Sequence, residues 1–212
     1  MKSDIHHLEI LNKNNYVVFQ VKSYKEAKSI CMNIGNIIHE NDIIPNARSK
    51  SLTNSYKALD FHTDHHRANI IGIYCLKPSS VGGETIIIDS YDVLSHFNKD
   101  ELSLLQTIYL YEHKIFENDP EKYPLLEYID NNYRIYYSYW LEKGGLSNKQ
   151  QEVFNKFKKL THTVKYIKFK LNANDFLLFD NRRMMHSRTE IKSGEERLLK
   201  RIWIELNTTK GE

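Results

Sequence analysis

The chain has 212 residues, and a length of this order suits one domain, so we predict a single domain over residues 1–212. Hydrophobic residues make up 41% of the chain and aromatic residues 12%, enough for a substantial core. The 30 basic and 27 acidic residues leave a formal net charge of only +3 with no long basic run, which gives no support to nucleic-acid binding.

The sequence also gives no support to membrane insertion. No apolar signal region opens it, and no apolar stretch of 18 residues occurs. Cys31 and Cys75 are interpreted as buried thiols and not as a disulfide. We therefore expect a cytoplasmic protein with a small-molecule substrate and no membrane or nucleic-acid partner; the oligomeric state is left open.

The first elements in chain order are a strand and a helix. Tyr16–Val21 has the composition of a strand, and Ser23 is placed to cap a helix over about Tyr24–His39. The stretch Asn41–Lys57 is polar and irregular, and it leads directly to a histidine-rich segment.

Short apolar runs dominate the rest of the chain. Helices are expected at about Asp92–Tyr109 and Asn148–Leu160, with Asp92 and Ser147 as caps, and Asp130–Asn132 is expected to form a hairpin turn. The runs rich in Ile, Val, Tyr and Phe are short enough to be strands; they are Ala68–Leu76, Thr85–Asp89, Tyr133–Trp140, Val164–Leu171, Phe176–Phe179 and Leu198–Leu206.

Many short strands with few helices predict a mainly β fold with flanking helices. We expect a double-stranded β-helix, which is a jelly-roll or cupin-like barrel, with the helices packed outside one sheet. A doubly wound parallel sheet is disfavoured, because strands and helices do not alternate regularly and no Gly-rich nucleotide loop follows a strand.

Three residues predict a metal site. His62 and Asp64 are two apart, and on a strand this spacing puts both side chains on one face. His186, arriving on another strand, would complete a set of two imidazoles and one carboxylate. Iron(II) oxygenases without haem use this set, because it occupies one face of an octahedral metal and leaves the other face open.

Two further features accompany these residues. Gly82 and Gly83 permit a tight turn just before Thr85, at the start of an apolar strand. Arg197 and Arg201 are four apart, so on a strand they point to one face, where a buried guanidinium would need an anion. Outside this set, His66 is expected to line the rim or to support the ligands from behind, and Arg188 is expected to pair with Asp180 or Glu190.

The chain resembles taurine dioxygenase-like proteins, a superfamily that includes clavaminate synthase-like and γ-butyrobetaine hydroxylase-like enzymes. The resemblance extends over about Leu59–Leu206 and rests on four segments in the family's order: Phe61–Asp64, Gly82–Thr85, Asp180–Arg188 and Arg197–Trp203. It implies an Fe(II)- and 2-oxoglutarate-dependent dioxygenase that uses dioxygen and releases succinate and carbon dioxide.

The resemblance also implies roles for individual residues. His62, Asp64 and His186 would bind iron, Thr85 and Arg197 would bind the cosubstrate, and Arg201 would contact either the cosubstrate or the substrate. No catalytic residue is expected beyond the metal ligands. Since the carboxylate of Asp64 is present, hydroxylation is expected and halogenation is disfavoured.

The substrate is expected to be a small metabolite such as an amino acid, free or carried in a natural-product pathway, and Arg134, Tyr137 and Trp140 are candidates to line its pocket. Two alternatives stay open. A zinc metallohydrolase uses the same kinds of ligand but does not need Thr85 and Arg197. A non-catalytic barrel that binds a small anion needs the arginines but no open metal face.

Overall fold

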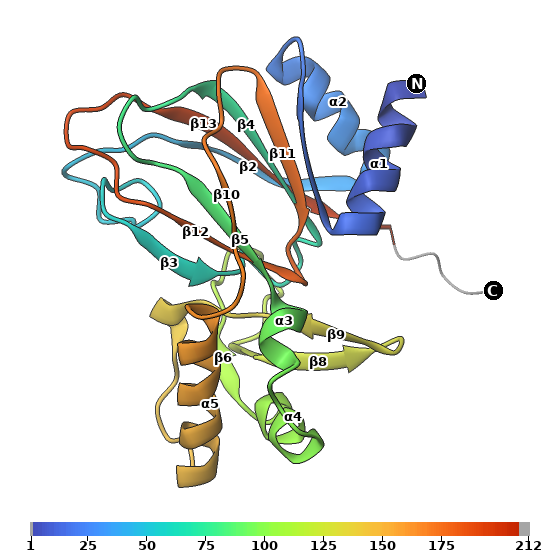
Figure 1. The fold of residues 1–212 in the computed structure, drawn as a ribbon, viewed down its shortest axis with the longest axis vertical. Helices are drawn as coiled ribbons and strands as arrows, with labels where there is room; N and C mark the ends of the chain where they lie inside the picture. Colours follow the sequence, from blue (N-terminus) through green and yellow to red (C-terminus); the bar gives the residue numbers. More distant parts are fainter. Residues whose placement is uncertain (1, 208–212) are drawn as a thin grey trace.

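Two antiparallel sheets face each other in the computed structural model, which describes residues 2–207 and side chains from residue 6 onward (Figure 1). The five-stranded sheet has the order β1-β11-β4-β13-β2, with β1 at Tyr16–Gln20, β11 at Asp175–Asp180, β4 at Ile70–Lys77, β13 at Leu198–Glu205 and β2 at Asn36–Ile43. The four-stranded sheet has the order β10-β5-β12-β3, with β10 at Ile167–Phe169, β5 at Thr85–Asp89, β12 at Met184–Arg188 and β3 at Leu59–His62. The predicted jelly-roll fold is confirmed.

The side chains of the central strands alternate between the two faces of their sheet, and apolar residues on both faces explain why each face is covered. On β11, Phe176 and Leu178 face the outside of the five-stranded sheet, whereas Leu177 and Phe179 face the space between the sheets. All four side chains are fully buried. Successive side chains of a strand point to opposite faces, so an apolar strand in this position needs cover on both sides.

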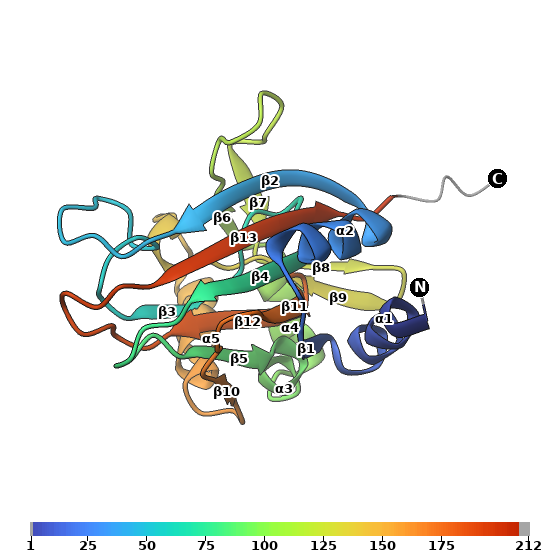
Figure 2. The ribbon, with the colours of Figure 1, turned by 90° about the horizontal axis from the view of Figure 1, so that it is seen from above.

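Helices supply that cover on the outer faces. The helices α1 (Lys2–Asn14) and α2 (Tyr24–Ile34) pack on the five-stranded sheet (Figures 1 and 2). On the four-stranded sheet lies a second group, made of α3 (Ser90–Leu94), α4 (Lys99–Gln106), α5 (Asn148–Thr161), the hairpins β6–β7 (Tyr109–Tyr111, Lys122–Pro124) and β8–β9 (Leu126–Ile129, Asn132–Ile135), and the 3₁₀ helix η1 (Tyr139–Leu141). None of the helices within residues 2–207 is long and apolar enough to cross a membrane.

Local sequence signals placed several boundaries correctly. Ser23 and Ser147 cap α2 and α5, and Ser147 forms a reciprocal capping box with Gln150. The turn between β8 and β9 puts Asp130 and Asn131 at φ 53° and 60°, a left-handed conformation that both residue types tolerate.

Other boundaries differ from the prediction. The helix expected to reach His39 ends at Ile34, and the following residues form β2, because β13 offers a strand edge that these residues complete. The helix expected over Asp92–Tyr109 is two helices, capped by Asp89 and Asn98 rather than Asp92. Helix α1 was not predicted.

Candidate metal centre and its pockets

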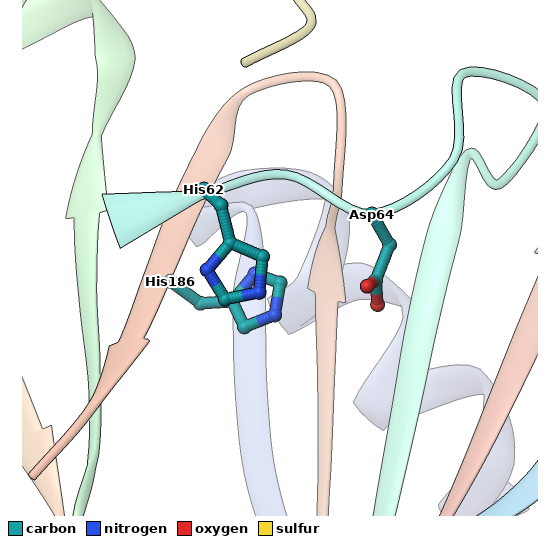
Figure 3. A group of neighbouring side chains, drawn as sticks. All are labelled: His62, Asp64 and His186. Atoms are coloured by element: carbon teal, nitrogen blue, oxygen red, sulfur yellow. The ribbon is translucent and has the colours of Figure 1, made fainter. Parts of the chain in front are cut away.

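His62, Asp64 and His186 come together between the two sheets (Figure 3). One ligand atom from each lies within 4.8 Å of the others, and the two imidazole ring centroids are 4.1 Å apart. All three residues are buried, with 3%, 8% and 7% of their surface exposed. His186 thus joins two residues that precede it by more than 120 positions in one compact donor set.

Strand pairing positions the two histidines. His62 ends β3 and is the register partner of His186 on β12, so both rings project from adjacent strands to the same side. The Nδ1–H of His62 donates to the carbonyl of Asp60 at 2.7 Å, which fixes the tautomer and leaves Nε2 without a proton.

Asp64 lies beyond the end of β3, so the prediction that it shares a strand with His62 is wrong in detail. Its position comes from Asn181, whose side-chain carbonyl accepts the Asp64 amide N–H at 2.8 Å while its amide donates to the Ala68 carbonyl at 2.8 Å. Asn181 immediately precedes the turn into β12. The loop that carries Asp64 is thus tied to the strand that carries His186.

The protonation states suit a metal. Burial lowers the pKa of both imidazoles, that of His186 to about 3 with a further contribution from neighbouring His62. Burial alone would raise the pKa of Asp64, but Arg201 and the two histidines outweigh it and the net pKa is lowered. At neutral pH the site therefore presents two neutral imidazoles and one carboxylate, the donor set that Fe(II), like Zn²⁺, accepts.

The first pocket beside this donor set brings together the predicted cosubstrate residues. Its lining includes His62 and His186 with Thr85, Arg197 and Arg201. Arg197 is 5% exposed, and its Nη2 donates to the Gly83 carbonyl at 3.2 Å. The structure therefore places Thr85 and Arg197 together, as the sequence predicted, at the side of the donor set nearest the histidines.

Arg188 is a pocket residue that the sequence analysis missed. The predicted pairing with Asp180 or Glu190 is wrong, because its guanidinium donates to three backbone carbonyls of residues 53–57. A usable signal existed, since Arg188 is two residues beyond His186 on β12 and so faces the same side.

A second pocket opens on the other side of Asp64. Its lining includes Asp64, Trp140, Arg201 and Trp203, together with Lys50–Thr53 from the segment between β2 and β3. Trp140 lies with its ring centroid 4.9 Å from that of His62, so this predicted substrate residue does line a pocket at the centre.

Arg201 lines both pockets and touches the donor set. Its Nη1 donates to Asp64 Oδ1 at 2.6 Å, and the Nε1–H of Trp203 donates to Asp64 Oδ2 at 3.1 Å. The predicted contact of Arg201 with a cosubstrate stays a prediction; in this structure its partner is Asp64.

Arg134 and Tyr137 do not line the pocket that contains Trp140. Arg134 pairs with Asp130 at 3.2 Å and, with Arg182, lines a groove and also a small cavity that Asp64 borders. Tyr137 is buried in the core against Phe154 and Phe157. The structure does not bring these two predicted substrate residues to the pocket that contains Trp140.

A second histidine cluster lies next to the centre. His65, His66 and Glu112 offer ligand atoms within 4.8 Å of one another. They already bond among themselves and their neighbours: His65 Nε2 pairs with Asp119 at 2.9 Å, and Tyr136 donates to Glu112 at 2.8 Å. These contacts fasten residues 112–119 beside Asp64, and they place His66 in a network behind the ligands, which is one of the two positions predicted for it.

Comparison with known proteins identifies one family whose model matches most of this chain. The model of the family "Taurine catabolism dioxygenase TauD, TfdA family" matches residues 24–203. The taurine hydroxylase-like protein SAT17 of Stachybotrys chartarum is 27% identical over 146 residues, a match that covers 62% of this chain and 37% of that protein. The chain spans less than half the length of the curated relatives it matches.

Solved structures share the fold at low identity. An asparagine oxygenase in complex with Fe(II), 2S,3S-3-hydroxyasparagine and succinate superimposes with a TM-score of 0.78 at 12% identity, covering 96% of this chain and 79% of that chain. The non-heme iron oxygenase OrfP in complex with Fe and α-ketoglutaric acid gives a TM-score of 0.77 at 14% identity, covering 96% and 80%. At such identities the likeness shows the common fold.

Proposed function

This chain belongs to the taurine catabolism dioxygenase TauD, TfdA family, and from that premise we propose that it is an Fe(II)- and 2-oxoglutarate-dependent oxygenase. It hydroxylates an unactivated carbon of a small metabolite and releases succinate and carbon dioxide. Its metal ligands are His62, Asp64 and His186.

One observation carries this proposal: the donor set lies between two pockets of different chemistry. The pocket on the histidine side contains two buried guanidinium groups, Arg188 and Arg197, and no carboxylate contributes to the electrostatics of either. Buried cations without an acidic partner favour binding of an anion. The charge of a dicarboxylate cosubstrate matches this pocket, and the second pocket is left for the substrate. A hydrolase has no need for the first pocket.

Each residue has a separate task in this scheme. Fe(II), 2-oxoglutarate and dioxygen together supply the oxidising power for hydroxylation. Arg197 and Thr85 bind the distal carboxylate of the keto acid, because a planar guanidinium and a hydroxyl match its oxygens. Arg201 and Trp203 orient the Asp64 carboxylate, and Trp140 shields the centre from water.

The second pocket narrows the substrate class. Lys50 and Arg201 contribute positive charge to its lining, and Asp64 is the only acidic residue there. An amino acid with a neutral or acidic side chain suits this lining better than a cationic one. Structural relatives act in both classes, with hydroxyasparagine in one complex and hydroxyarginine in another. We propose that the substrate is a free or carrier-bound amino acid with a neutral or acidic side chain.

The two cysteines, Cys31 and Cys75, are buried and not joined in a disulfide, and on this basis we propose a reducing, cytoplasmic compartment.

The test is a screen for succinate release. The protein is loaded anaerobically with Fe(II) and 2-oxoglutarate, which should give a weak visible charge-transfer band. It is then exposed to air with each of the common amino acids. Mass spectrometry should detect succinate above the uncoupled background and the gain of one oxygen atom on one neutral or acidic compound.

Two variants make the screen decisive. His186→Ala should abolish both the absorption band and succinate release, whereas the matched control His96→Ala, at an exposed position, should keep them. A protein that hydrolyses esters with Zn²⁺ and shows no 2-oxoglutarate-dependent band would instead be a metallohydrolase. A protein that binds the keto acid without iron-dependent turnover would be an anion-binding barrel.

A further inference from the structure

Arg188 connects the first pocket to the segment that walls the second. It is 5% exposed and follows His186 by two residues on β12. Its Nη1 donates to the Thr53 carbonyl at 2.7 Å, and its Nη2 donates to the carbonyls of Ser55 and Lys57 at 2.7 and 2.6 Å. Three carbonyls within five residues therefore converge on one guanidinium.

The acceptors belong to the β2–β3 segment, which we define as residues 44–58. This segment contains no helix or strand. Its other ties to the barrel include the Ile191 amide N–H, which donates to the Tyr56 carbonyl at 2.8 Å. Residues 50–53 line the second pocket, and Thr53 lines both pockets. The position of this segment consequently sets the shape of the proposed substrate pocket.

Arg188 still has hydrogen-bonding capacity directed inside the protein. Its Nε–H is buried and has no hydrogen-bond partner among the described residues. Arg188 on β12 is paired with Thr85 on the neighbouring strand β5, and Arg188, Thr85 and Arg197 line the first pocket together. A buried, unpaired N–H on a cation costs free energy that a bound anion relieves.

The electrostatics support the same conclusion. The pKa of both Arg188 and Arg197 is lowered to about 10, chiefly by burial, and for Arg197 the charge of Arg188 contributes to this decrease. Two guanidinium groups thus repel each other across a buried pocket. A dicarboxylate bound between Thr85 and Arg197 removes this repulsion.

We propose that Arg188 couples cosubstrate binding to the order of the β2–β3 segment. The inference rests on the proposed function: the bound 2-oxoglutarate provides the counter-charge for Arg188, and the guanidinium so held fixes residues 53–57 and with them the wall of the substrate pocket. Arg188 is a positioning residue, and the keto acid prepares the second pocket before the substrate enters.

The coupling requires a guanidinium in particular. Arginine offers five N–H donors in a fixed planar fork, enough for three carbonyls and an anion together. The ammonium of lysine keeps the charge but has three donors around one point. Arg188→Lys should therefore retain a positive pocket and lose the simultaneous contacts.

Amide hydrogen exchange of the full chain tests the proposal. Exchange of peptides from residues 50–57 is measured with Fe(II) alone and with Fe(II) plus saturating 2-oxoglutarate, anaerobically. In the wild type we expect 2-oxoglutarate to slow exchange there by about 5- to 150-fold, the usual range for coupled sites, while α5 is unchanged. In Arg188→Lys, 2-oxoglutarate should bind about tenfold more weakly and no longer slow exchange in this segment at saturation.

The controls separate the possible failures. Arg183→Lys is matched, because Arg183 pairs with Asp89 at 2.8 Å outside both pockets, and it should behave as the wild type. Calorimetry first establishes that the wild type binds 2-oxoglutarate; if it does not, the proposed function itself is wrong. If it binds but residues 50–57 are unaffected, or if Arg188→Lys keeps the full effect, the coupling is wrong. If circular dichroism shows that Arg188→Lys does not fold, Arg188→Gln takes its place. The exchange of residues 50–57 in the wild type refutes the proposal by itself if 2-oxoglutarate binds and does not slow it.

Discussion

Among single residues, Arg197 and Arg201 show how two residues of one type, four positions apart, have different partners and so different roles. Arg197 and Arg201 are four apart on or beside β13 and face the same interior space. Arg197 lies among Thr85 and the Gly83 carbonyl, without an acidic partner, whereas Arg201 is bonded to Asp64. The first is available to a ligand, and the second is already engaged in holding a metal ligand.

Replacing Arg197 should therefore affect the cosubstrate specifically. Arg197→Ala should raise the 2-oxoglutarate concentration for half-maximal succinate release by roughly 10- to 150-fold, because a charge-assisted hydrogen bond is worth about 1.5–3 kcal/mol. Titration of 2-oxoglutarate at saturating Fe(II) measures this. Arg67→Ala, which breaks a half-exposed pair with Glu205 on the surface, is the control and should leave the titration unchanged. If Arg197→Ala keeps the wild-type requirement, the carboxylate is bound by other groups in the pocket.

At the scale of elements, the junction between α2 and β2 decides how the five-stranded sheet is completed. Gly35 ends α2, and its N–H bonds the Cys31 carbonyl. One residue later the chain is already in β2, paired with β13. Gly35 packs so closely on β13 that an added Cβ would lie 2.4 Å from the Glu205 carbonyl oxygen and 3.1 Å from Ile204 Cγ2.

Gly35→Ala should consequently destabilise the fold. The contact is with backbone, so the strand must shift, and overpacking of this kind costs about 1–3 kcal/mol. For a chain of this size the melting temperature should fall by roughly 2–12 °C. Gly144→Ala is the matched control, since no atom lies within 4 Å of its added Cβ, and it should melt like the wild type. Equal melting temperatures for the two variants would show that β13 yields without cost.

The same junction marks the limit of sequence reasoning. Local chemistry identified the Ser147 cap and the Asp130–Asn131 turn, because each depends on neighbours in the chain. The strand nature of Asn36–Ile43 depends on a partner edge more than 150 residues away, which no local pattern reports. For the candidate site, the two-residue spacing of His62 and Asp64 could be read directly, and the family resemblance added His186. The role of Arg188 could not, because its partners are backbone carbonyls, which carry no sequence signature.

At the scale of the whole molecule, four layers enclose the candidate site. The helices α1 and α2 cover the five-stranded sheet, and the second helical group with its two hairpins covers the four-stranded sheet (Figure 1). The donor set lies in the layer between the sheets, where its side chains are buried from water and Asp64 is bonded to Arg201. A metal-free site of this kind ties the stability of the fold to pH.

Acid should destabilise the metal-free protein, and the sign follows from the histidines. The pKa of His186 is lowered to about 3 in the folded state, and that of His62 is lowered too, against about 6.5 for an unfolded chain. Below about pH 6.5 the unfolded state binds more protons, so the stability is fully present above that pH and is lost as the pH falls towards 3. The lowered pKa of Asp64 acts in the same direction, but only below its unfolded value of about 3.9.

The effect of His186 can be isolated by urea unfolding with a chelator present at about pH 7, 6 and 5. In the wild type each buried histidine should lower the free energy of unfolding by up to about 1 kcal/mol per pH unit in this window. His186→Leu removes one titrating group while keeping apolar bulk, so its free energy of unfolding should fall less steeply. His96→Leu, at the surface, should keep the wild-type slope. Parallel slopes for all three proteins would mean that the pKa of His186 in the folded protein equals that in the unfolded chain, which would contradict the lowering of its pKa by burial.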